Sequence, residues 1–584
     1  MSSSSASSDY DVIVLGGGAP GEHCAAALTA RGLRVAVVER ELVGGECSYW
    51  ACIPSKSLLR PGEAVHGARE AAARAEVDVQ AALDWRDFMV SNYSDAGQER
   101  WLAGRGIELL RGSGRLAGTG AVEVDGVRHT ADHVVVATGA DPIVPPIPGL
   151  GGLEGVWGTR EATSMKAVPR RLLVLGGGSA GVELAQVVRR LGGEAVLVEG
   201  ADRVLPREAA PLGEALGEAL RRDGIELVLG MHVTAARREG EEYVLKLDGG
   251  TELRGDRLLV ATGRRPRVDG IGLETVGVAA DPHGIQVDEY LSAGERLWAI
   301  GDVNGRWPLT HVGEYEGDVV AANIAGDLRA ANYEAVPRVT YTDPQAAAVG
   351  AVEAEYSATT PISEVPKTAT YTHAYAESNG FLTLLSDGER LTGAYALGPE
   401  AGEWLQQATL AIRAQVPLEV LDDTIQPFPS FSGIYDAALK ALRMNVADMP
   451  RPITPMDAQM ASLSDVAGRS PTSRTGGSAM EFLIEFEINV PAGAPESEVT
   501  AREDAEAAAA AKLEDEGHLL RLWKRRITPG ETRPIGLYRA DSETEMDDLM
   551  RALPLYDWMR VTITPLEHHP NDPAGRRALD RSQA

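Results

Sequence analysis

Two of the chain's three cysteines, Cys47 and Cys52, are separated by only four residues at the predicted start of a helix. At this spacing the two sulfurs can reach each other across one helical turn, as in a redox-active pair. A helix N-terminus favours the thiolate, because its unpaired N–H groups and its dipole attract negative charge. The alternatives are two buried structural cysteines or half of a zinc site. No second pair of cysteines or histidines completes a tetrahedral site, so we expect no metal.

A βαβ unit precedes this pair and indicates where its electrons come from. Its parts are a buried strand (11–15), a glycine-rich turn (Gly16, Gly18 and Gly21), a helix (25–30), a second strand (34–38) and Glu39. The glycines permit a tight turn and the close approach of a pyrophosphate to the helix N-terminus, and the final acid can bind ribose hydroxyls. The unit therefore predicts a dinucleotide site.

The same unit occurs a second time. Its parts are a strand (172–175), a turn (Gly176, Gly178 and Gly181), a second strand (195–198) and Glu199. We therefore predict that two dinucleotides bind one chain. Because Glu199 repels a 2′-phosphate and accepts hydrogen bonds from a free ribose diol, the second site favours NADH over NADPH. Arg203 is close in the sequence and keeps NADPH possible.

Together these residues resemble the pyridine nucleotide-disulfide oxidoreductase family, whose members include dihydrolipoamide dehydrogenase, glutathione reductase and mercuric reductase. The resemblance covers about residues 10 to 445. Further matching segments are Ala137-Thr138-Gly139, Ala261-Thr262-Gly263-Arg264-Arg265-Pro266, Trp298-Ala299-Ile300-Gly301-Asp302 and Tyr341-Thr342-Asp343-Pro344. The resemblance implies that FAD is the first nucleotide, and we expect the cofactors also to contact Gly45, Thr138, Gly139 and Gly263.

The resemblance assigns roles beside the flavin as well. It implies that Asp302 holds the ribityl region, that Cys52 contacts the flavin and that Cys47 exchanges with the substrate. It also implies that Lys56 pairs with Glu183 near the flavin. From the residues alone, an ordinary ion pair is the alternative for these two. The catalytic candidates are therefore Cys47, Cys52, Lys56 and Glu183.

One segment departs from the family. Disulfide reductases usually carry a histidine near the end of the dimerisation domain and a glutamate five residues later, but Phe428 and Gly433 occupy these positions here. Phenylalanine cannot protonate a leaving thiolate as histidine does. Three consequences stay open: the substrate carries its own proton donor, Tyr435 or His311 serves instead, or the acceptor is a quinone, oxygen or a metal ion. Mercury is a weak alternative, because no cysteine follows Cys52.

The last part of the chain reads as a separate small domain. The predicted elements are a strand (481–490), a helix (498–516), two strands (519–527 and 534–539), a helix (543–551) and a last strand (559–564), which is the ferredoxin-like order. Its residues 480 to 572 resemble muconolactone Δ-isomerase, notably over 517–524, 553–559 and 561–570. The resemblance makes Glu506 a candidate proton carrier, although an ordinary solvated helix face is the favoured interpretation. His568 and His569 are expected to pack or to face solvent.

The predicted fold class is α/β, with two Rossmann-like dinucleotide-binding domains (FAD and NAD), an α+β dimerisation domain and a ferredoxin-like α+β domain. The expected boundaries are a disordered tail (1–9), an FAD-binding domain in two parts (10–160 and 283–335), an NAD(H)-binding domain (161–282), a dimerisation domain (336–450), a linker (451–479), an isomerase-like domain (480–572) and a tail (573–584).

Charge and composition limit the partners and the cellular compartment that we expect. A formal net charge of −29 over 584 residues disfavours nucleic acid and anionic membrane surfaces, because both would be repelled. No apolar run approaches the roughly 20 residues of a membrane helix, and the Ser-rich start does not read as a signal peptide. A catalytic cysteine pair suits a reducing compartment, and Cys24 is expected to pack in a core. We expect a cytoplasmic homodimer or larger homo-oligomer that acts on a small molecule.

The sequence thus predicts an FAD-dependent, NADH-oxidising flavoenzyme with a redox-active disulfide, fused to an isomerase-like domain. Two alternatives remain. In one, the chain is a bifunctional redox-isomerase that acts on an unsaturated cyclic or lactone intermediate. In the other, it is a flavin dehydrogenase or quinone reductase whose last domain serves only assembly.

Overall fold

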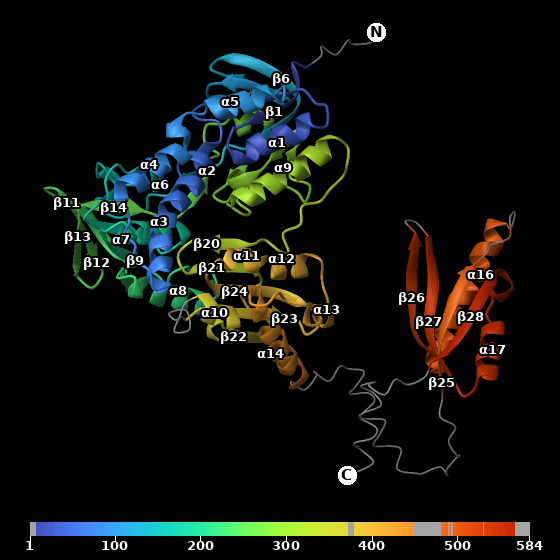
Figure 1. Cartoon of the computed structure of the whole chain (residues 1–584). Helices are drawn as coiled ribbons and strands as arrows, with labels where there is room; N and C mark the ends of the chain where they lie inside the picture. Colours follow the sequence, from blue (N-terminus) through green and yellow to red (C-terminus); the bar gives the residue numbers. More distant parts are fainter. Residues whose placement is uncertain are drawn as a thin grey trace, which may run out of the picture. The chain divides into compact units, whose positions relative to one another are not determined.

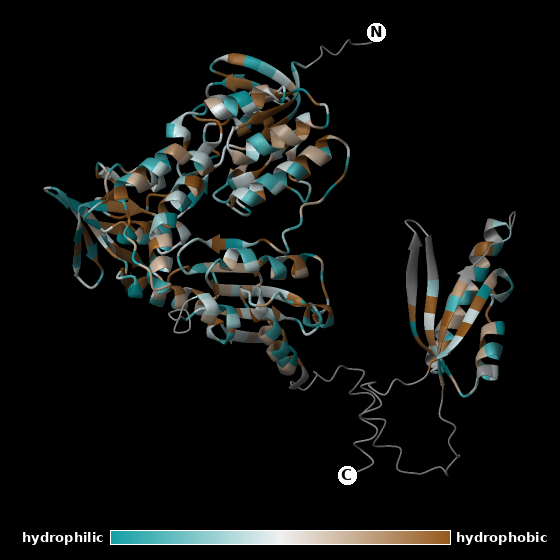
Figure 2. Ribbon diagram, in the orientation of Figure 1, coloured by the Kyte–Doolittle hydropathy of each residue, from teal (hydrophilic) through white to brown (hydrophobic). Residues whose placement is uncertain are grey.

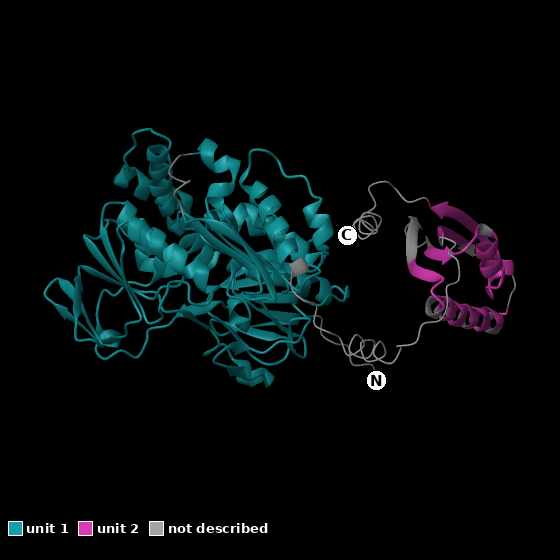
Figure 3. Cartoon of the chain, turned by 90° about the horizontal axis from the view of Figure 1, so that it is seen from below, with its two compact units in different colours: residues 1–451 teal, residues 452–584 magenta. Residues whose placement is uncertain are grey.

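The structure is a computed structural model that describes residues 8–371, 379–448, 480–488, 491, 495–528 and 531–566. It divides into two compact units, residues 1–451 and 452–584, each described here by itself (Figure 3). The predicted linker (451–479) and C-terminal tail (573–584), together with His568 and His569, lie outside the described residues. In the described part of the chain, no helix combines the length and the apolar character that crossing a membrane requires.

The first Rossmann sheet is centred on β1 (Tyr10–Leu15), which pairs in parallel with β2 (Val35–Glu39) and β6 (Val127–Val136). The full order is β18-β19-β6-β1-β2-β3, where β3 spans Glu108–Arg111, β18 Ser292–Gly294 and β19 Leu297–Ala299. Both faces of β1 are covered, because Val12 and Val14 join one core while Ile13 and Leu15 join another. From Val12 to Leu15 the strand is therefore a continuous apolar run, as expected of a buried parallel strand (Figure 2).

Helices place the cysteine segment against this sheet (Figure 1). α1 (Ala19–Thr29) follows β1, and α2 (Gly45–Tyr49) and α3 (Cys52–Glu70) follow β2. α9 (Thr310–Ile324) returns from the second part of the FAD-binding region and packs on α1, where Gly317 lies against Cys24. The expected core position of Cys24 is confirmed, since its side chain is fully buried.

The second Rossmann unit repeats the first. Its parallel sheet has the order β10-β9-β8-β14, with β8 at Arg171–Leu175, β9 at Glu194–Glu199, β10 at Glu226–Leu229 and β14 at Arg257–Val260. α7 (Ser179–Arg190) follows β8 as α1 follows β1, and α8 (Ala210–Arg222) follows β9. An antiparallel sheet of β11 (Val233–Glu239), β12 (Glu242–Leu247) and β13 (Glu252–Gly255) flanks it.

Shorter elements complete these two regions. They are α4 (Val79–Met89), α5 (Ala96–Ala103), α6 (Thr159–Thr163), β4 (Gly114–Leu116), β5 (Ala121–Val124), β7 (Ala140–Pro142), β15 (Arg264–Pro266), β16 (Ala280–Asp281) and β17 (Gly284–Ile285). β7 and β15 pair with each other where the chain passes between the two dinucleotide-binding regions. At the N-terminus, Ser8 and Asp9, which belong to the predicted tail, are hydrogen-bonded to Asp132 and Thr130.

The third region of this unit is a five-stranded antiparallel sheet with helices. The order is β20-β21-β24-β23-β22, with bounds Arg338–Thr340, Gln345–Gly350, Leu391–Gly398, Phe381–Ser386 and Tyr356–Pro361. Its helices are α10 (Pro366–Tyr371), α11 (Ala401–Trp404), α12 (Gln406–Arg413), α13 (Leu418–Asp422) and α14 (Ile434–Asp448). This is the expected α+β domain.

The second unit has the predicted ferredoxin-like plan. Its elements are β25 (Met480–Ile488), α16 (Glu496–Asp515), β26 (Leu519–Thr528), β27 (Glu531–Ala540), α17 (Glu543–Arg551) and β28 (Met559–Leu566), in the sheet order β26-β27-β25-β28. Phe482, Ile484 and Phe486 alternate into the core along β25, where they meet Met546 and Met550 of α17. The period-two pattern of the sequence therefore identified the buried face correctly.

The close contact of α1 with α9 yields a stability prediction. A Cβ added at Gly317 would lie 3.1 Å from the Cβ of Cys24 and 3.2 Å from its backbone N. We expect Gly317→Ala to destabilise the unit by about 1–3 kcal/mol, because two helix backbones must separate. The measurement is the midpoint of the unfolding transition that releases flavin.

Gly67→Ala on α3 is the matched control. Nothing lies within 4 Å of a Cβ at this helical position, so the substitution should stabilise the helix by up to about 1 kcal/mol. Equal midpoints for Gly317→Ala and the parent protein would contradict the packing described above.

Candidate active site

The two cysteines lie on two consecutive helices rather than on one. Cys47 is within α2, Cys52 is the first residue of α3, and Ala51 between them is non-helical with φ −130° and ψ −94°. Both thiols are free, and they hydrogen-bond to each other. The predicted pair is therefore brought together, and the kink at Ala51 gives Cys52 a helix N-terminus of its own.

The environment makes the two thiols unequal. The pKa of Cys52 is lowered to about 6, and the main cause is a hydrogen bond from the Cys47 thiol. A hydrogen bond from Thr310 and the positive charge of Lys56 lower it further, whereas burial opposes the shift. The pKa of Cys47 is raised by the same thiol contact, by burial and by the negative charges of Cys52 and Glu314, while the Thr310 hydroxyl lowers it as it lowers that of Cys52. Cys52 is therefore the sulfur that ionises first when the pair is reduced.

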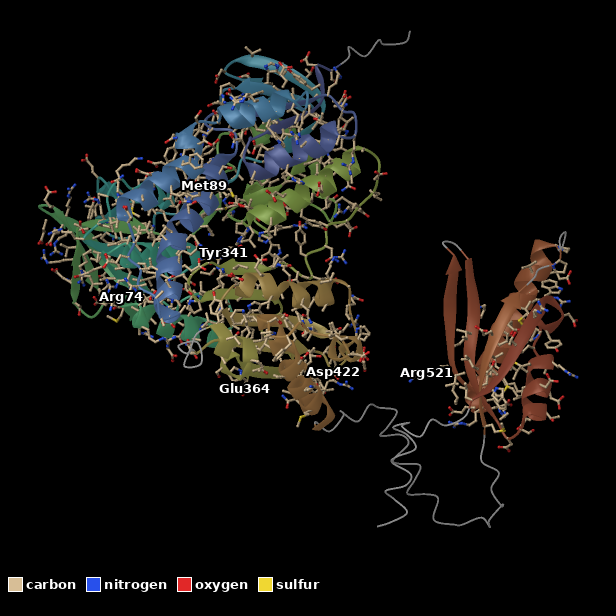
Figure 4. The ribbon with its side chains drawn as sticks, in the orientation of Figure 1. Arg74, Met89, Tyr341, Glu364, Asp422 and Arg521 are labelled. Atoms are coloured by element: carbon tan, nitrogen blue, oxygen red, sulfur yellow. The ribbon has the colours of Figure 1, made fainter. Side chains whose placement is uncertain are left out.

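Lys56 and Glu183 form the expected contact. Lys56 Nζ lies 2.8 Å from Glu183 Oε2, and the glutamate on α7 is 4% exposed. The backbone N of Tyr341 donates to Glu183 Oε1 at 2.9 Å, and Lys56 Nζ lies 4.8 Å from the centre of the Tyr341 ring, which is labelled in Figure 4. The pair thus joins the cysteine helix to the second Rossmann unit and to the start of the dimerisation region.

A cavity of about 570 Å³ opens beside the cysteines. It is lined by both sulfur residues and by Gly16, Gly18, Glu39, Gly45, Thr138, Gly139 and Asp302, which are the residues expected to hold FAD apart from Gly21. Gly21 has another role, because a Cβ there would lie 2.0 Å from the carbonyl oxygen of Gly16. It allows α1 to begin directly against the turn.

The shape of this cavity fits a dinucleotide. Nothing lies within 4 Å of a Cβ at Gly18, the residue that precedes α1, whereas one at Gly16 would meet the Ala137 oxygen at 2.3 Å. The turn is therefore closed towards the sheet and open towards the cavity, where the N–H groups of α1 can receive a pyrophosphate. Glu39 fixes the turn, because Oε2 accepts from Gly17 N at 2.9 Å and Oε1 from Glu41 N at 2.7 Å.

The second turn repeats this arrangement. Glu199 Oε2 accepts from Gly177 N at 2.6 Å and Oε1 from Ala201 N at 2.9 Å. The three glycines correspond as well: a Cβ at Gly176 would meet the Ala261 oxygen at 2.5 Å, one at Gly178 meets nothing within 4 Å, and one at Gly181 would meet the Gly176 oxygen at 2.0 Å. Gly263, with φ +128°, follows β14. Arg203 bonds to Asp202 and to the carbonyl oxygen of Pro206.

Glu316 is a supporting residue that the sequence analysis missed. Its carboxylate accepts hydrogen bonds from Gly301 N at 2.6 Å, Asn304 Nδ2 at 2.9 Å and Tyr333 Oη at 2.7 Å. It thereby fixes the turn that carries Asp302. Burial raises the pKa of Glu316 and is the main cause of the raised pKa of Asp302. The signal that could have identified it was an acidic residue within the segment that forms the largely buried helix α9.

The segment predicted to carry the altered family positions is exposed in this chain. Phe428 is 82% exposed, and Gly433 closes a short helical turn after it. Tyr435, one of the predicted substitutes for histidine, is 1% exposed and is held by Trp404 O and Ala408 N. Burial raises its pKa and keeps its hydroxyl from solvent, which speaks against Tyr435 as a proton donor to substrate. His311 is exposed and contacts the carbonyl oxygen of Pro337 at 2.9 Å.

In the second unit, Glu506 differs from the favoured expectation of a solvated face. Its side chain is half-buried, Oε2 accepts from Leu555 N at 3.1 Å, and burial raises its pKa. Burial, with the nearby Glu506 charge, raises the pKa of Tyr538 to about 12. Arg502, one turn earlier, lies over the Trp558 ring at 4.4 Å. Glu506 thus faces the 553–558 connection together with an aromatic and a cationic side chain.

No group of three or more His, Cys, Asp or Glu side chains in the described ranges is placed to hold a metal ion. In the first unit a sulfur pair lies beside the cavity that fits a dinucleotide.

Comparison with known proteins identifies the class. The family model "Pyridine nucleotide-disulphide oxidoreductase" matches residues 10–317, and the dimerisation domain of the same family matches residues 336–438. This chain belongs to the pyridine nucleotide-disulphide oxidoreductase family, whose members use FAD and a pyridine nucleotide. The model "Muconolactone delta-isomerase" matches residues 480–572, as the sequence resemblance predicted.

Particular relatives come from two groups of enzymes. The chain is 36% identical over 450 residues to dihydrolipoyl dehydrogenase of Thermus scotoductus, a match that covers 74% of this chain and 96% of that protein. It is 32% identical over 468 residues to mercuric reductase of Streptomyces lividans, covering 75% and 98%. The solved Cu(II) complex of the HOCl-induced flavoprotein disulfide reductase RclA from Escherichia coli has a TM-score of 0.66 at 24% identity, covers 74% of this chain and 99% of that chain, and shares the fold.

Proposed function

We propose that this chain is an FAD-dependent oxidoreductase that takes electrons from NADH and passes them through a Cys47–Cys52 disulfide. The observation that carries the proposal is the position of Cys52. Cys52 lines the same cavity as the residues expected to hold FAD. Its pKa is lowered to about 6, and the Cys47 thiol is the main cause. Such a thiol is a thiolate at neutral pH, which is the form that attacks disulfides and binds metals.

When bound, FAD supplies hydride acceptance from the pyridine nucleotide and an electron pair for the sulfurs. Reduction breaks the bond between the two sulfurs, leaves Cys52 as a thiolate and adds one proton to Cys47. The raised pKa of Cys47 keeps that proton on the outer sulfur. Return of the pair to the disulfide releases two electrons and this proton to the acceptor.

Lys56 and Glu183 support the reduction of the disulfide because of where they lie beside Cys52. The ammonium group of Lys56 lowers the pKa of Cys52, while the buried glutamate fixes the ammonium 2.8 Å away. At the second turn, Glu199 at the end of β9 favours NADH, since its carboxylate would accept hydrogen bonds from a ribose diol and would repel a 2′-phosphate.

The acceptor is proposed from the predicted absence of the family's acid-base pair. Phe428 has no proton to give to a leaving thiolate, and Tyr435 is buried. We therefore favour an acceptor without a thiol leaving group, namely a metal ion, a quinone or oxygen, over lipoamide or glutathione disulfide. Relatives that are mercuric reductases support the metal-ion class.

We propose a cytoplasmic homodimer, supported by the dimerisation domain at residues 336–438.

Replacing the outer sulfur tests this function. We expect Cys47→Ser to lower NADH-dependent reduction of Cu(II) by about 100-fold or more, because electrons can no longer leave through the pair. Turnover is followed as NADH oxidation with Cu(II), a quinone and lipoamide in parallel. Cys24→Ser, at the buried third cysteine, is the matched control and should turn over like the parent protein. Full turnover of Cys47→Ser with every acceptor would show that the pair is outside the reaction path.

A second function is proposed for the last domain, on the observation that Glu506 is half-buried beside Leu555 N. A carboxyl group with a raised pKa can carry a proton between two carbons of an unsaturated lactone. This would make the chain a bifunctional redox-isomerase. The alternative is that the domain only assembles the protein.

Glu506→Gln separates these two roles. If the domain is catalytic, isomerisation of an unsaturated lactone should fall by about 100-fold while the oligomer mass stays constant. Glu516→Gln, near the exposed end of the same helix, is the control and should retain activity. Equal activity of both variants and the parent would exclude Glu506 as the proton carrier.

A further inference from the structure

Acidic side chains outnumber basic ones around the cavity that fits a dinucleotide. Six carboxylates line it against four guanidinium groups, which belong to Arg40, Arg160, Arg264 and Arg267. A pyrophosphate would bring further negative charge, and like charges repel strongly where little water screens them. Binding of an anionic dinucleotide therefore depends on how the acids of this wall are neutralised.

Glu46 is the acid that stands beside the turn expected to receive the pyrophosphate. It lies in the first turn of α2, next to Gly45, where a Cβ would lie 2.8 Å from the Cα of Gly18. Gly18 is the N-cap of α1, so the start of α2 packs directly on this turn. Burial is the main cause of the raised pKa of Asp302, and the charge of Glu46 raises it further. The carboxylate of Glu46 is therefore felt inside the cavity.

Arg160 of α6 is paired with this acid. Its Nε and one Nη contact Glu46 Oε1 at 2.7 and 2.5 Å, and its two Nη atoms reach the carboxylate of Glu41 at 2.9 and 3.1 Å. Its Cζ lies 4.0 Å from the centre of the Trp50 ring, and Trp50 O accepts a hydrogen bond from Thr163 Oγ1 at 3.1 Å. In the described part of the chain, Arg160 is the only cation paired with Glu46.

Two buried polar atoms of the same wall point to a ligand. Glu46 Oε2 and Thr159 Oγ1 have no hydrogen-bond partner among the described residues, and both residues line the cavity. Arg160 takes only Oε1 of the glutamate, so Oε2 remains available to a hydroxyl donor of a bound group.

We propose that Arg160 is a positioning residue for FAD: by neutralising Glu46, it allows this carboxylate to stand beside the pyrophosphate without repelling it. The Trp50 ring and Glu41 hold the guanidinium group in place. The inference deepens the proposed function and rests on it, because it assumes that this cavity holds FAD. It adds to the glycine-rich turn and its acid a basic residue from a distant part of the chain.

The test is a double-mutant cycle on FAD affinity. Full-length holoprotein is diluted in steps, and free FAD is measured by its fluorescence, which gives the dissociation constant. The variants are Arg160→Gln, Glu46→Gln and the two substitutions together. Arg115→Gln is the matched control, because Arg115 and Glu123 form an exposed ion pair at 3.9 Å on β4 and β5.

Arg160→Gln should weaken FAD affinity by about tenfold or more, because Glu46 is left unpaired beside the pyrophosphate. Glu46→Gln should stay within about threefold of the parent protein, and adding it to Arg160→Gln should restore the affinity to about that level. Raising NaCl from about 0.02 to about 0.5 M should narrow the gap between Arg160→Gln and the parent protein, because salt screens like charges. A purely structural role of Arg160 would produce neither the rescue nor the salt effect.

An affinity of Arg160→Gln equal to that of Arg115→Gln would overturn the inference, and so would a loss that Glu46→Gln does not restore. If Arg160→Gln is purified without FAD, the double variant decides: bound FAD in it supports the inference, and its absence overturns it. Failure of the parent protein to bind FAD would end the proposed function as well, whereas normal binding in the parent with no effect of Arg160→Gln would end this inference alone.

Discussion

The structure depends on holding negative charge on a sulfur that is largely withdrawn from water. Burial alone would raise the pKa of Cys52, and the chain counteracts this with a second thiol, a hydroxyl, an ammonium group and two helix N-termini. They come from α2, α3 and α9, and Glu183 of α7 holds the ammonium group in place. The arrangement therefore requires α2, α3, α7 and α9 to be in register before any electron transfer can take place.

The repeated βαβ unit provides this register. In both copies an acid at the end of the second strand bonds the turn that follows the first strand, and a glycine in the first turn of the helix packs against the carbonyl oxygen of the glycine that opens the loop. The first copy positions the cysteine helices beside one cavity, and the second supplies Glu183. The same βαβ unit thus occurs twice, and it serves both cofactor binding and the support of the redox pair.

Much of this was predictable from the sequence. The apolar strands, glycine spacing and terminal acids of both units were local signals, and so was the alternation along β25. The pairing of Lys56 with Glu183 came from the family resemblance. Residues far apart in the sequence were not predictable in this way: Thr310 and Glu316 matter because α9 returns to the first sheet. The burial of Tyr435 and Glu506 also depends on tertiary packing, which helical periodicity alone did not reveal.

In the proposed function the cysteine pair is electronically coupled to a bound flavin. Anaerobic titration of the holoprotein with NADH, followed by its absorbance spectrum, measures this coupling. We expect the parent protein to take up two electron pairs and to show a long-wavelength thiolate-flavin band, and Cys52→Ser to take up one pair and to show no such band. Uptake of one pair by both proteins, with equal reoxidation by quinone or oxygen, would contradict it and leave a flavin dehydrogenase with an inactive sulfur pair.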